Sequence, residues 1–556
     1  MIQKSAIGMA AKTFEQATLS FDQIPGQSKL FLDFQNDSMP TTAFYPEKNA
    51  PLDEFAAQVT ANYKIDRTEL CDVLEEANKS LNAGSRTFEN INRLREKDCT
   101  AIVTGQQAGL FSGALYTIYK AFSAIKLADD LRKKNIEAVP VFWIAEEDHD
   151  FDEVKKTFNL DKTGKLLESE NAPRGYVENS PVGLVVLDET INDAVENLFE
   201  NLPHTEFTDE IKKILTETHC VGEAYSRAFG KFIARLFADY GLIIVAPLNE
   251  KLKKLCAPLF TEAVEKSGEI IHALLDRNRE LAAENYQPQV LVTTDNFPFF
   301  YQSESGARQS LRRNANNGKI KIQKTKTEFE TAKLVKIAEH SPSRLSPNAL
   351  LRPIVQDYLL PTLVYFGGAA EIAYFAQNSV IYKTLNRPVT PIHHRASLTI
   401  IERKHGRTLV KYDVDFVNLF DGQEKTESKI VEHFLNRETA RTFAETEEII
   451  SVQLARLDRR LSADEPTLSD NLANRRKKIL WHLGALRKKY HRAEMTKNEL
   501  VKRRMESLFT ALLPNDALQE RTLNIITFLN LYGENFIEWI YAAVETDEKN
   551  HQIISL

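Results

Sequence analysis

The feature that most constrains the fold is a strand, a glycine-containing loop, a helix and a second strand in close succession. Thr100 to Thr104 is a short apolar strand, and the loop Gly105 to Gly113 follows it directly. Apolar residues then recur with helical spacing over about 114–133, before a second apolar strand at 139–145. Because such connections are right-handed and join parallel strands, the segment predicts a β-α-β unit.

The alternation of helices with short, continuously apolar strands continues along the chain. It predicts an α/β fold with a doubly wound, mostly parallel sheet, in which residues 160–205 form an insertion. The residues before about 98 are expected to pack outside this sheet. We expect further helices near 222–240 and 250–284, and strands at 241–247, 289–294, 298–301, 359–366, 389–392 and 398–401.

The pattern changes between about residues 424 and 512, where apolar residues recur at steps of three, four and seven. Two such series flank Pro466 and predict two helices paired antiparallel. An isolated pair exposes apolar flanks, so it either docks on its own core as a scaffold or, as we prefer, forms a homodimer through a coiled coil. The predicted domains are a core at 1–423, the hairpin at 424–512, and helices returning to the core at 513–556.

Composition excludes several classes of partner. With 71 basic and 78 acidic residues the formal charge is −7, and no basic block suits a nucleic acid. The apolar runs are of strand length rather than membrane length, which predicts no membrane association. The N-terminus lacks a signal-peptide pattern, and Cys71, Cys99, Cys220 and Cys256 show no CxxC spacing. We therefore expect a cytoplasmic protein.

The first candidate site is the loop after the first strand, since ligands of open α/β sheets bind at the carboxyl ends of strands. Gly105, Gly109 and Gly113 are spaced by four residues. This spacing matches neither the dinucleotide-binding motif GxGxxG nor the phosphate-loop motif GxxxxGK(S/T). Glycines allow backbone N–H groups to approach an anion. The alternative is a tight strand-to-helix turn. The side chains that offer neutral donors here are Gln106, Gln107 and Ser112.

The second candidate site is an acidic loop around His149, directly after the second strand. Repulsion among so many carboxylates suggests that a magnesium nucleotide or an amine substrate offsets their charge. Alternatively, Asp148 or Asp150 caps the next helix. Hard carboxylate ligands favour magnesium over zinc, although we assign no residue to a metal. The acidic residues are Glu146, Glu147, Asp148, Asp150, Asp152 and Glu153.

The third candidate region contains Arg352, whose planar guanidinium can bind a carboxylate or phosphate with two hydrogen bonds. The ordinary alternative is an ion pair with Asp357 or a neighbour. Other polar residues and glycines of this region are candidates for the same crevice: Gln356, Gly367, Gly368, Glu371, Tyr374, His394 and Arg395.

Several segments together resemble the bacillithiol cysteine ligase family, BshC. They are Thr104-Gly-Gln-Gln-Ala-Gly-Leu, Ser112-Gly-Ala-Leu-Tyr116-Thr, Pro140-Val-Phe-Trp-Ile-Ala-Glu-Glu-Asp-His-Asp, Leu345-Ser-Pro-Asn and Leu351-Arg-Pro. They occur in order along most of the chain, and the hairpin fits the same family. Two places depart from the family pattern: Gly367-Gly-Ala-Ala-Glu371 stands where the family often has Gly-Gly-Pro-Gly-Glu, and Phe375 where it has Trp.

The resemblance implies a Rossmann-like core, a coiled-coil homodimer, and a reaction that joins cysteine to glucosaminyl malate. Amide formation needs an activated carboxyl, and ATP, with or without Mg²⁺, is the expected activator. On this hypothesis the Gly105–Gly113 loop cradles an anionic group, and Arg352 holds a carboxylate or phosphate. Asp148, His149 and Asp150 bind the amine or take its proton. None of the four cysteines is expected to act as a nucleophile, because none lies in these motifs.

Two other functions fit parts of the pattern. A nucleotidyl transferase or adenylate-forming synthetase also combines a Rossmann-like core with insertions and a helical arm, but the chain has no His-Ile-Gly-His and no Lys-Met-Ser-Lys-Ser stretch. A coiled-coil dimeric scaffold without activity has no use for polar residues at two adjacent strand ends. The sequence leaves the form of carboxyl activation open.

Overall fold

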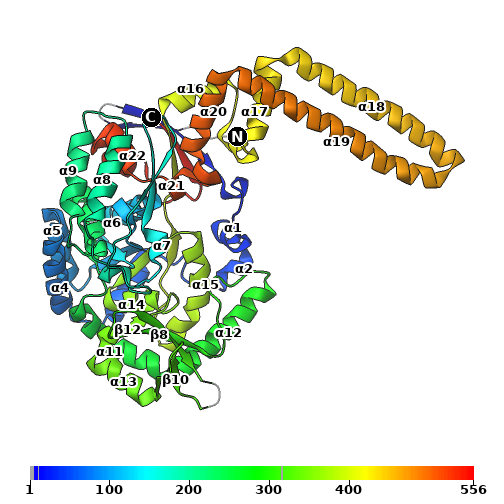
Figure 1. The fold of residues 1–556 in the computed structure, drawn as a ribbon. Helices are drawn as coiled ribbons and strands as arrows, with labels where there is room; N and C mark the ends of the chain where they lie inside the picture. Colours follow the sequence, from blue (N-terminus) through cyan, green and yellow to red (C-terminus); the bar gives the residue numbers. More distant parts are fainter. Residues whose placement is uncertain (1–4, 10–11, 315–316) are drawn as a thin grey trace. The chain divides into compact units, whose positions relative to one another are not determined.

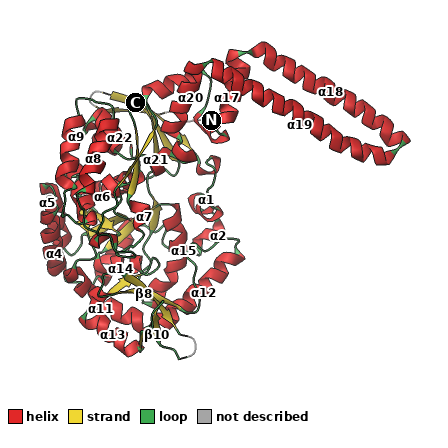
Figure 2. Ribbon diagram, in the orientation of Figure 1, coloured by secondary structure: helices red, strands yellow, loops and turns green. Residues whose placement is uncertain are grey.

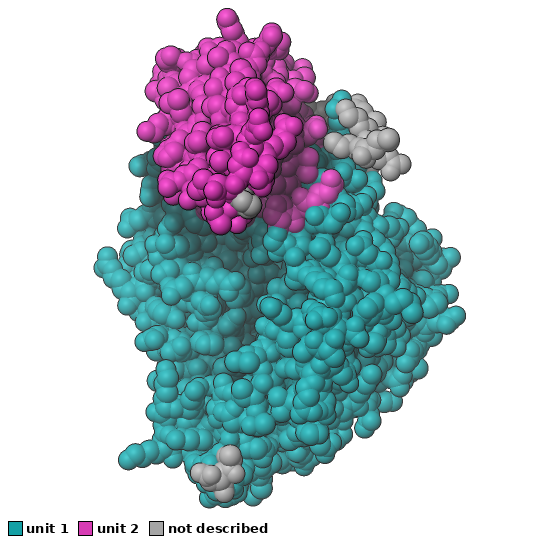
Figure 3. Space-filling view, turned by 90° about the vertical axis from the view of Figure 1, so that its right-hand side faces the viewer, with its two compact units in different colours: residues 1–22, 26–399, 520–553 teal, residues 23–25, 400–519, 554–556 magenta. Residues whose placement is uncertain are grey.

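The structure is a computed structural model that describes residues 5–9, 12–314 and 317–556 (Figure 1). The chain divides into two compact units, coloured separately in Figure 3. The first comprises residues 1–22, 26–399 and 520–553, and the second 23–25, 400–519 and 554–556. The division at 399 precedes the boundary that the sequence suggested at 423, because short helices that follow residue 402 pack with the hairpin rather than with the sheet.

The core of the first unit is a five-stranded parallel sheet. Its strands are β3 Thr100–Gln106, β4 Ala138–Ile144, β7 Ile243–Val245, β13 Thr362–Gly367 and β14 Ile392–His394. They lie in the spatial order β14-β13-β3-β4-β7, and every neighbouring pair is parallel. When the five strands are numbered by their order in the chain and the sheet is followed from β7 to β14, the order is 3-2-1-4-5, that of a doubly wound Rossmann fold. The predicted fold class is confirmed.

The helix α6 Tyr116–Lys133 forms the crossover between β3 and β4 and packs against both strands. Its side chains are buried along most of its length, so it carries little of the polar face that marks a surface helix. On the far edge of the sheet, Asn78 covers β7. Its side-chain amide accepts from Ile244 N at 3.0 Å and donates to Ile244 O at 2.9 Å, which satisfies an otherwise open strand edge.

A second sheet of the first unit, in the order β11-β10-β9-β8-β12, is antiparallel. Its strands are β8 Asn296–Gln302, β9 Arg308–Arg313, β10 Ile320–Ile322, β11 Glu328–Phe329 and β12 Leu345–Pro347. The strand predicted at 298–301 therefore belongs to this sheet and not to the core. The reason is the short β8–β9 connection, which can join only antiparallel strands.

Two expectations for individual elements were wrong. Residues 289–294 form no strand, because the Gln377 side chain, rather than a neighbouring strand, bonds both the N–H and the C=O of Val290, each at 2.9 Å. The long helix expected at 250–284 is two helices, α11 Glu250–Glu265 and α12 Ser267–Ala283, because Lys266 leaves the helical conformation.

The remaining elements of the first unit surround these sheets. The insertion expected at 160–205 contains part of the two-stranded sheet β5-β6 and the helix α8. The helices are α1 Lys29–Gln35, α2 Met39–Thr42, α3 Leu52–Asn62, α4 Arg67–Ser80, α5 Ser85–Arg95, α7 Phe151–Val154, α8 Thr190–Asn201, α9 Thr208–Thr218, α10 Tyr225–Leu236, α13 Thr331–His340, α14 Arg352–Leu359, α15 Ala369–Thr384, α22 Ile526–Tyr532 and α23 Asn535–Ala543. The strands are β1 Ser5–Met9, β2 Lys12–Leu19, β5 Lys156–Leu160 and β6 Leu166–Glu170.

Three short elements cross the division between the units: β15 Leu398–Ile401, α21 Gln519–Thr522 and β16 His551–Ser555. The second unit is helical (Figure 2). Its long hairpin consists of α18 Arg437–Asp464 and α19 Pro466–Lys497, which pack against each other as predicted. Phe443 and Tyr490 meet between them with ring centroids 5.8 Å apart. The other helices are α16 Arg403–Lys411, α17 Gln423–Ile430 and α20 Glu499–Leu512.

Among the helices of the described residues, none combines the length and the apolar character that crossing a bilayer requires.

Candidate active site

A cavity of about 490 Å³ opens at the carboxyl ends of the core strands, within the first unit. In the order 3-2-1-4-5 the connections from β3 and β13 leave in opposite directions, which creates a crevice between these strands. Both predicted loops reach this cavity. Its lining comprises Gly105, Gln106, Gln107, Tyr116, Lys120, Trp143, Ala145, Glu147, Asp148, His149, Glu153, Phe300, Arg308, Pro347, Asn348, Ala349, Arg352, Tyr365, Gly368, Ala369, Ala370, Glu371, Tyr374, Arg395 and Arg521.

One end of the cavity, which we call the acidic end, is formed by Gln107, Asp148 and Glu153. The Gln107 amide donates to Asp148 Oδ2 at 2.8 Å and to Glu153 Oε2 at 2.9 Å, so it ties the first loop to the second. Asp148 Oδ1 accepts the backbone N–H of His149 at 2.7 Å. Burial alone would raise the pKa of the Asp148 carboxyl, but His149, the Arg308 charge and the Gln107 amide hold it well below its usual value. Asp148 is therefore a permanent anion.

Protein groups offset most of the charge in the acidic loop. Glu146 lies fully buried outside the cavity lining, where it accepts from Ser226 Oγ at 2.7 Å and Leu248 N at 2.8 Å. Burial raises the pKa of this carboxyl to about 7. Asp150 is exposed and accepts from Glu153 N at 3.3 Å at the start of α7, which is the capping alternative. The remaining partners are Lys253 for Glu147 and Lys155 for Asp152.

A second part of the cavity lining, which we call the basic end, contains Lys120, Arg352, Arg395 and Arg521 together with Glu371. Lys120 is buried on α6 and forms an ion pair with Glu371. It also donates to Gly105 O at 2.8 Å and to Gln106 Oε1 at 2.9 Å. Lys120 thereby connects the first glycine of the loop to the acid that begins α15.

Glu371 is held by three donors. Besides Lys120, it accepts from Tyr365 Oη at 2.6 Å and from Gly368 N at 2.8 Å. Burial alone would raise the pKa of its carboxyl, but Lys120, the Gly368 N–H and Tyr365 together lower it. Glu371 thus serves the local structure and holds Lys120 in place.

Arg352 differs from Lys120 and Arg395, because its hydrogen-bond partners are neutral. Its guanidinium donates to Gln356 Oε1 and to Tyr374 Oη, both at 3.0 Å, and lies 3.5 Å from Tyr365 Oη. Burial raises the pKa of Tyr374 to about 12, so this hydroxyl stays protonated. Within the described part of the chain, no carboxylate forms an ion pair with Arg352. The expected pairing with Asp357 does not occur, since Gln356 stands between them and bonds to both.

Arg395 and Arg521 enter the cavity from segments that are remote from the glycine loop. Arg395 is paired with buried Glu520 at 2.7 Å and lies over the Tyr116 ring. Arg521 is exposed, and no acidic side chain among the described residues pairs with it. The basic end therefore has two cations, Arg352 and Arg521, whose charge is free for an anionic ligand.

Several candidate residues lie outside the cavity lining, and their contacts explain why. Thr104 donates to Phe366 O at 2.9 Å between two strands, and Gly367 lies within β13. His394 is half-buried and contacts the rings of Phe21 and Phe31, with centroids 5.0 and 4.9 Å away, and desolvation lowers its pKa. The other residues outside the lining are Gly109, Ser112, Gly113, Asp150 and Gln356.

The segment from Gly109 to Gly113 adopts the tight-turn alternative. A side chain at Gly109 would meet the Gly113 Cα at 2.7 Å, and Gly113 has a φ of +68°. The amide of Asn524, far along the chain, donates to Phe111 O at 2.8 Å and Gly113 O at 2.7 Å. Backbone carbonyls of this segment are therefore bonded to Asn524 rather than open to a ligand. Of the loop, only Gly105 to Gln107 line the cavity.

Sequence reasoning missed several lining residues. Lys120 had a local indication, since it is a lone charge in the largely apolar first half of a helix. Asn348 lies in the Leu345-Ser-Pro-Asn segment, although we assigned it no role. Arg308 and Arg521 had no local indication, because they come from a second sheet and from the C-terminal segment.

Both departures from the family pattern lie at the cavity or beside it. Ala369 and Ala370, which replace Pro and Gly, line it at the start of α15. Phe375 stacks on Tyr365 with centroids 5.1 Å apart and planes 12° apart. The Phe375 ring thus packs against Tyr365, over whose ring the Arg352 guanidinium lies.

Comparisons with known proteins agree along nearly the whole chain. Residues 15–396 match the model of the N-terminal Rossmann-like domain of bacillithiol biosynthesis BshC, and residues 398–556 match its C-terminal coiled-coil domain. A protein of Koribacter versatilis named "Putative cysteine ligase BshC" is 33% identical, with 96% of this chain and 98% of that protein covered.

Relatives of the same name in other bacteria are similarly close. The protein of Salinibacter ruber is 31% identical over 95% of this chain and 96% of its own length, and that of Bacillus anthracis is 29% identical over 88% and 91%. A solved structure titled as an arginyl-tRNA synthetase of Campylobacter jejuni aligns with a TM-score of only 0.23 at 9% identity, covering 82% of this chain and all of that one, and supports no conclusion. Both domain models and the full-length relatives agree that this chain belongs to the bacillithiol biosynthesis BshC family.

Proposed function

We propose that this protein joins L-cysteine to glucosaminyl malate through an ATP-dependent amide bond. The proposal rests on the two kinds of charge that line one cavity: Arg352 and Arg521, which no acidic side chain of the described residues pairs with, at its basic end, and Asp148 and Glu153 at its acidic end. Glucosaminyl malate has two carboxylates and one amine, and this distribution complements the cavity. A volume of about 490 Å³ lies in the usual range for a small-molecule site.

We assign the malate carboxylates to the basic end, where the Arg352 guanidinium can form two charge-assisted hydrogen bonds. The sugar amine then lies toward Asp148 and Glu153, which favour its ammonium form until it reacts. The names of the relatives support a cysteine ligase, and the choice of sugar malate as the acceptor is ours.

The bond change requires an activated cysteine carboxyl, since a free carboxylate has no good leaving group. Transfer of a phosphoryl group from ATP to a carboxylate oxygen, with release of ADP, or of an adenylyl group, with release of pyrophosphate, supplies one. The amine nitrogen then attacks the carbonyl carbon, the C–N bond forms, the C–O bond breaks, and phosphate or AMP leaves with the bonding pair. Starting from the ammonium form, the nitrogen loses two protons, one before it attacks and one as the amide forms. Glu153 is a candidate to take the first, because among the described residues only Gln107 donates to its carboxylate. The departing phosphate or AMP can carry the second. Arg521 at the basic end has the donors that phosphate oxygens require.

The decisive assay mixes the purified full-length protein with cysteine and glucosaminyl malate, and detects the thiol product by mass spectrometry with ATP supplied or withheld. We expect product only with ATP, and one ATP consumed per amide formed. Product without ATP would contradict the activation scheme. ATP turnover that ignores the sugar malate would indicate a nucleotidyl transferase, and calorimetry that shows no binding of ATP, cysteine or the sugar malate would indicate a scaffold.

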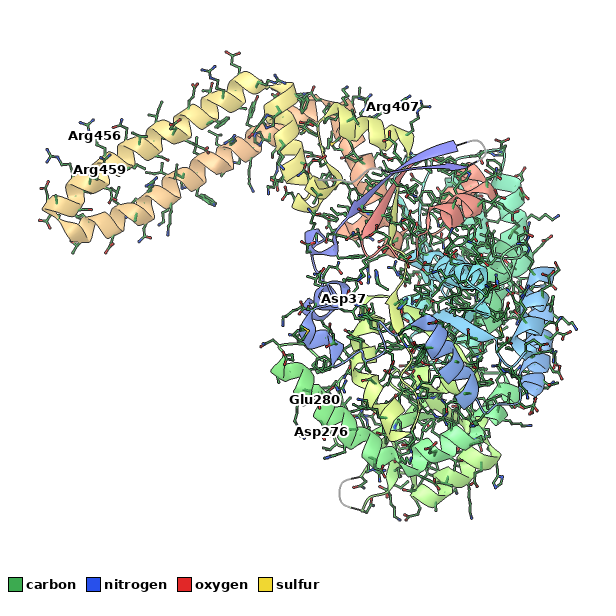
Figure 4. The ribbon with its side chains drawn as sticks, turned by 180° about the vertical axis from the view of Figure 1, so that it is seen from behind. Asp37, Asp276, Glu280, Arg407, Arg456 and Arg459 are labelled. Atoms are coloured by element: carbon green, nitrogen blue, oxygen red, sulfur yellow. The ribbon has the colours of Figure 1, made fainter. Side chains whose placement is uncertain are left out.

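We further propose that the α18–α19 hairpin makes the protein a homodimer. Large apolar side chains remain exposed along both helices, including Ile449 at 62%, Trp481 at 67% and Leu486 at 57%. Figure 4 labels two side chains of the same arm, Arg456 and Arg459 of α18. Apolar side chains exposed along a hairpin are the usual mark of a protein interface.

Replacing both Trp481 and Leu486 with glutamate is expected to convert the dimer into a monomer, because two charges would have to be buried at the interface. Light scattering during size-exclusion chromatography measures the mass. The matched control carries Trp481→Phe and Leu486→Met and should stay dimeric. A wild-type protein that is monomeric at micromolar concentration would refute the proposal.

A further inference from the structure

Arg308 reaches the cavity from the antiparallel sheet and contacts His149 on the acidic loop. Its Nη1 lies 3.3 Å from His149 Nδ1. The rest of its guanidinium is committed, since Nε donates to Ser346 Oγ at 3.0 Å and Nη2 donates to Pro347 O at 2.8 Å. The group also lies over the Phe300 ring, 3.9 Å from its centroid, with only 8% of its side chain exposed. Arg308 is therefore fixed in its orientation toward His149.

This contact determines which ring nitrogen of His149 carries the proton. A guanidinium has only donors and stays protonated in proteins, so the partner atom Nδ1 must accept with its lone pair. A neutral imidazole that accepts at Nδ1 carries its proton on Nε2. The contact thus favours the tautomer that carries its proton on Nε2.

Asp148 is the other charged group beside the ring. Its Oδ1 lies 3.5 Å from His149 Nδ1, which is long for a hydrogen bond, and 3.6 Å from Arg308 Nη1. The two oxygens of Asp148 are already engaged by His149 N and the Gln107 amide. Phe300, the remaining neighbour, is not ionisable, and its ring centroid is 5.8 Å from that of His149. Arg308 is therefore the best hydrogen-bond partner of Nδ1.

We propose that His149 acts as a neutral hydrogen-bond donor through Nε2–H, toward an oxygen that gains negative charge during the reaction, and that Arg308 is the positioning residue that sets this tautomer. The inference rests on the proposed function for the identity of that oxygen, which belongs to the activated carboxyl or to its leaving group. Among the described residues Nε2 has no hydrogen-bond partner, and the side chain is 32% exposed at the cavity.

The assignment replaces the role of His149 as a base. Nε2 already carries a proton and Nδ1 is occupied by Arg308, so neither nitrogen can take a proton from the amine. Glu153 remains the candidate to accept a proton from the amine, because no cation among the described residues forms an ion pair with its carboxylate. A preorganised donor at a developing negative charge lowers the barrier because it need not reorient during the reaction.

Neutron diffraction from crystals of the perdeuterated full-length protein tests the tautomer without any substrate. We expect deuterium on Nε2 of His149 and none on Nδ1 in the wild type. In Arg308→Met, Nδ1 loses its donor, and we expect deuterium to move to Nδ1, facing Asp148. Deuterium on Nδ1 in the wild type, alone or together with Nε2, would overturn the inference, even if the protein makes the proposed product.

Kinetics of His149 variants test the donor role. His149→Gln keeps an amide donor near the position of Nε2 but has no basic nitrogen, and we expect it to retain activity within about tenfold of the wild type. His149→Leu removes the donor, and we expect a loss of about 10²- to 10³-fold in kcat, the usual effect of deleting one oxyanion donor. Equal losses in both variants would contradict the donor role. If even the wild type makes no product, the proposed function fails, while the neutron result still decides the tautomer.

Discussion

Replacing Arg352 with methionine is expected to lower kcat/KM for product formation by about 10²- to 10³-fold. Loss of one partner from a buried, charge-assisted pair costs about 2–5 kcal/mol, and roughly 1.4 kcal/mol corresponds to a factor of ten. Arg352 should reach the middle of this range, because its partners Gln356, Tyr365 and Tyr374 are neutral and leave its charge for the ligand.

The conservative change Arg352→Lys sharpens this prediction. Lysine keeps the charge but loses the planar pair of donors, so we expect an intermediate loss, mainly in KM for the sugar malate. Arg387→Met is the matched control, because Arg387 is also partly buried and lies over a tyrosine ring, that of Tyr358, but outside this cavity. Steady-state kinetics at saturating ATP measure the effect. Activity of Arg352→Met within threefold of wild type would remove Arg352 from the binding site.

Replacing Lys120 with methionine is expected to lower the free energy of unfolding by about 3–5 kcal/mol, the usual cost of removing one partner of a buried ion pair. Among the described residues, the variant leaves the buried Glu371 carboxylate with only Tyr365 and Gly368 as donors. Urea unfolding measures the change. Lys212→Met is the control, since the Lys212–Glu196 pair is exposed and should contribute less than about 1 kcal/mol.

The pH dependence gives this prediction a second measurement. In the wild type the pKa of Glu371 is lowered, so its contribution to stability is complete above the unfolded pKa and is lost as the pH falls below it. Without Lys120 burial dominates and raises this pKa, so protonation at low pH should relieve the buried charge. The deficit of Lys120→Met should therefore shrink as the pH falls, and the double variant with Glu371→Gln should recover part of it at neutral pH. A deficit that is independent of pH would contradict this account.

The sequence alone determined the local elements and the approximate position of the site. Helical spacing over 114–133 and the two apolar strands beside it specify the β-α-β unit, and the apolar series on either side of Pro466 specify the hairpin. These features depend on residues that are close in the chain, where periodicity reports directly which face is buried. Because both loops follow parallel strands, their meeting at one cavity also follows from the sequence.

Only the tertiary structure decided which side chains complete that cavity. Lys120 forms an ion pair with Glu371, which lies 251 residues further along the chain. Asn524 donates hydrogen bonds to the glycine turn, which lies more than 400 residues before it. Arg308 reaches His149 from another sheet. Contacts between residues so far apart leave no periodic pattern, because each partner is chosen by the packing of whole elements. The same packing made Gly109 to Gly113 a tight turn held by the Asn524 side chain. It also placed His394 against the Phe21 and Phe31 rings, although the local sequence allowed both the turn and His394 to face a ligand.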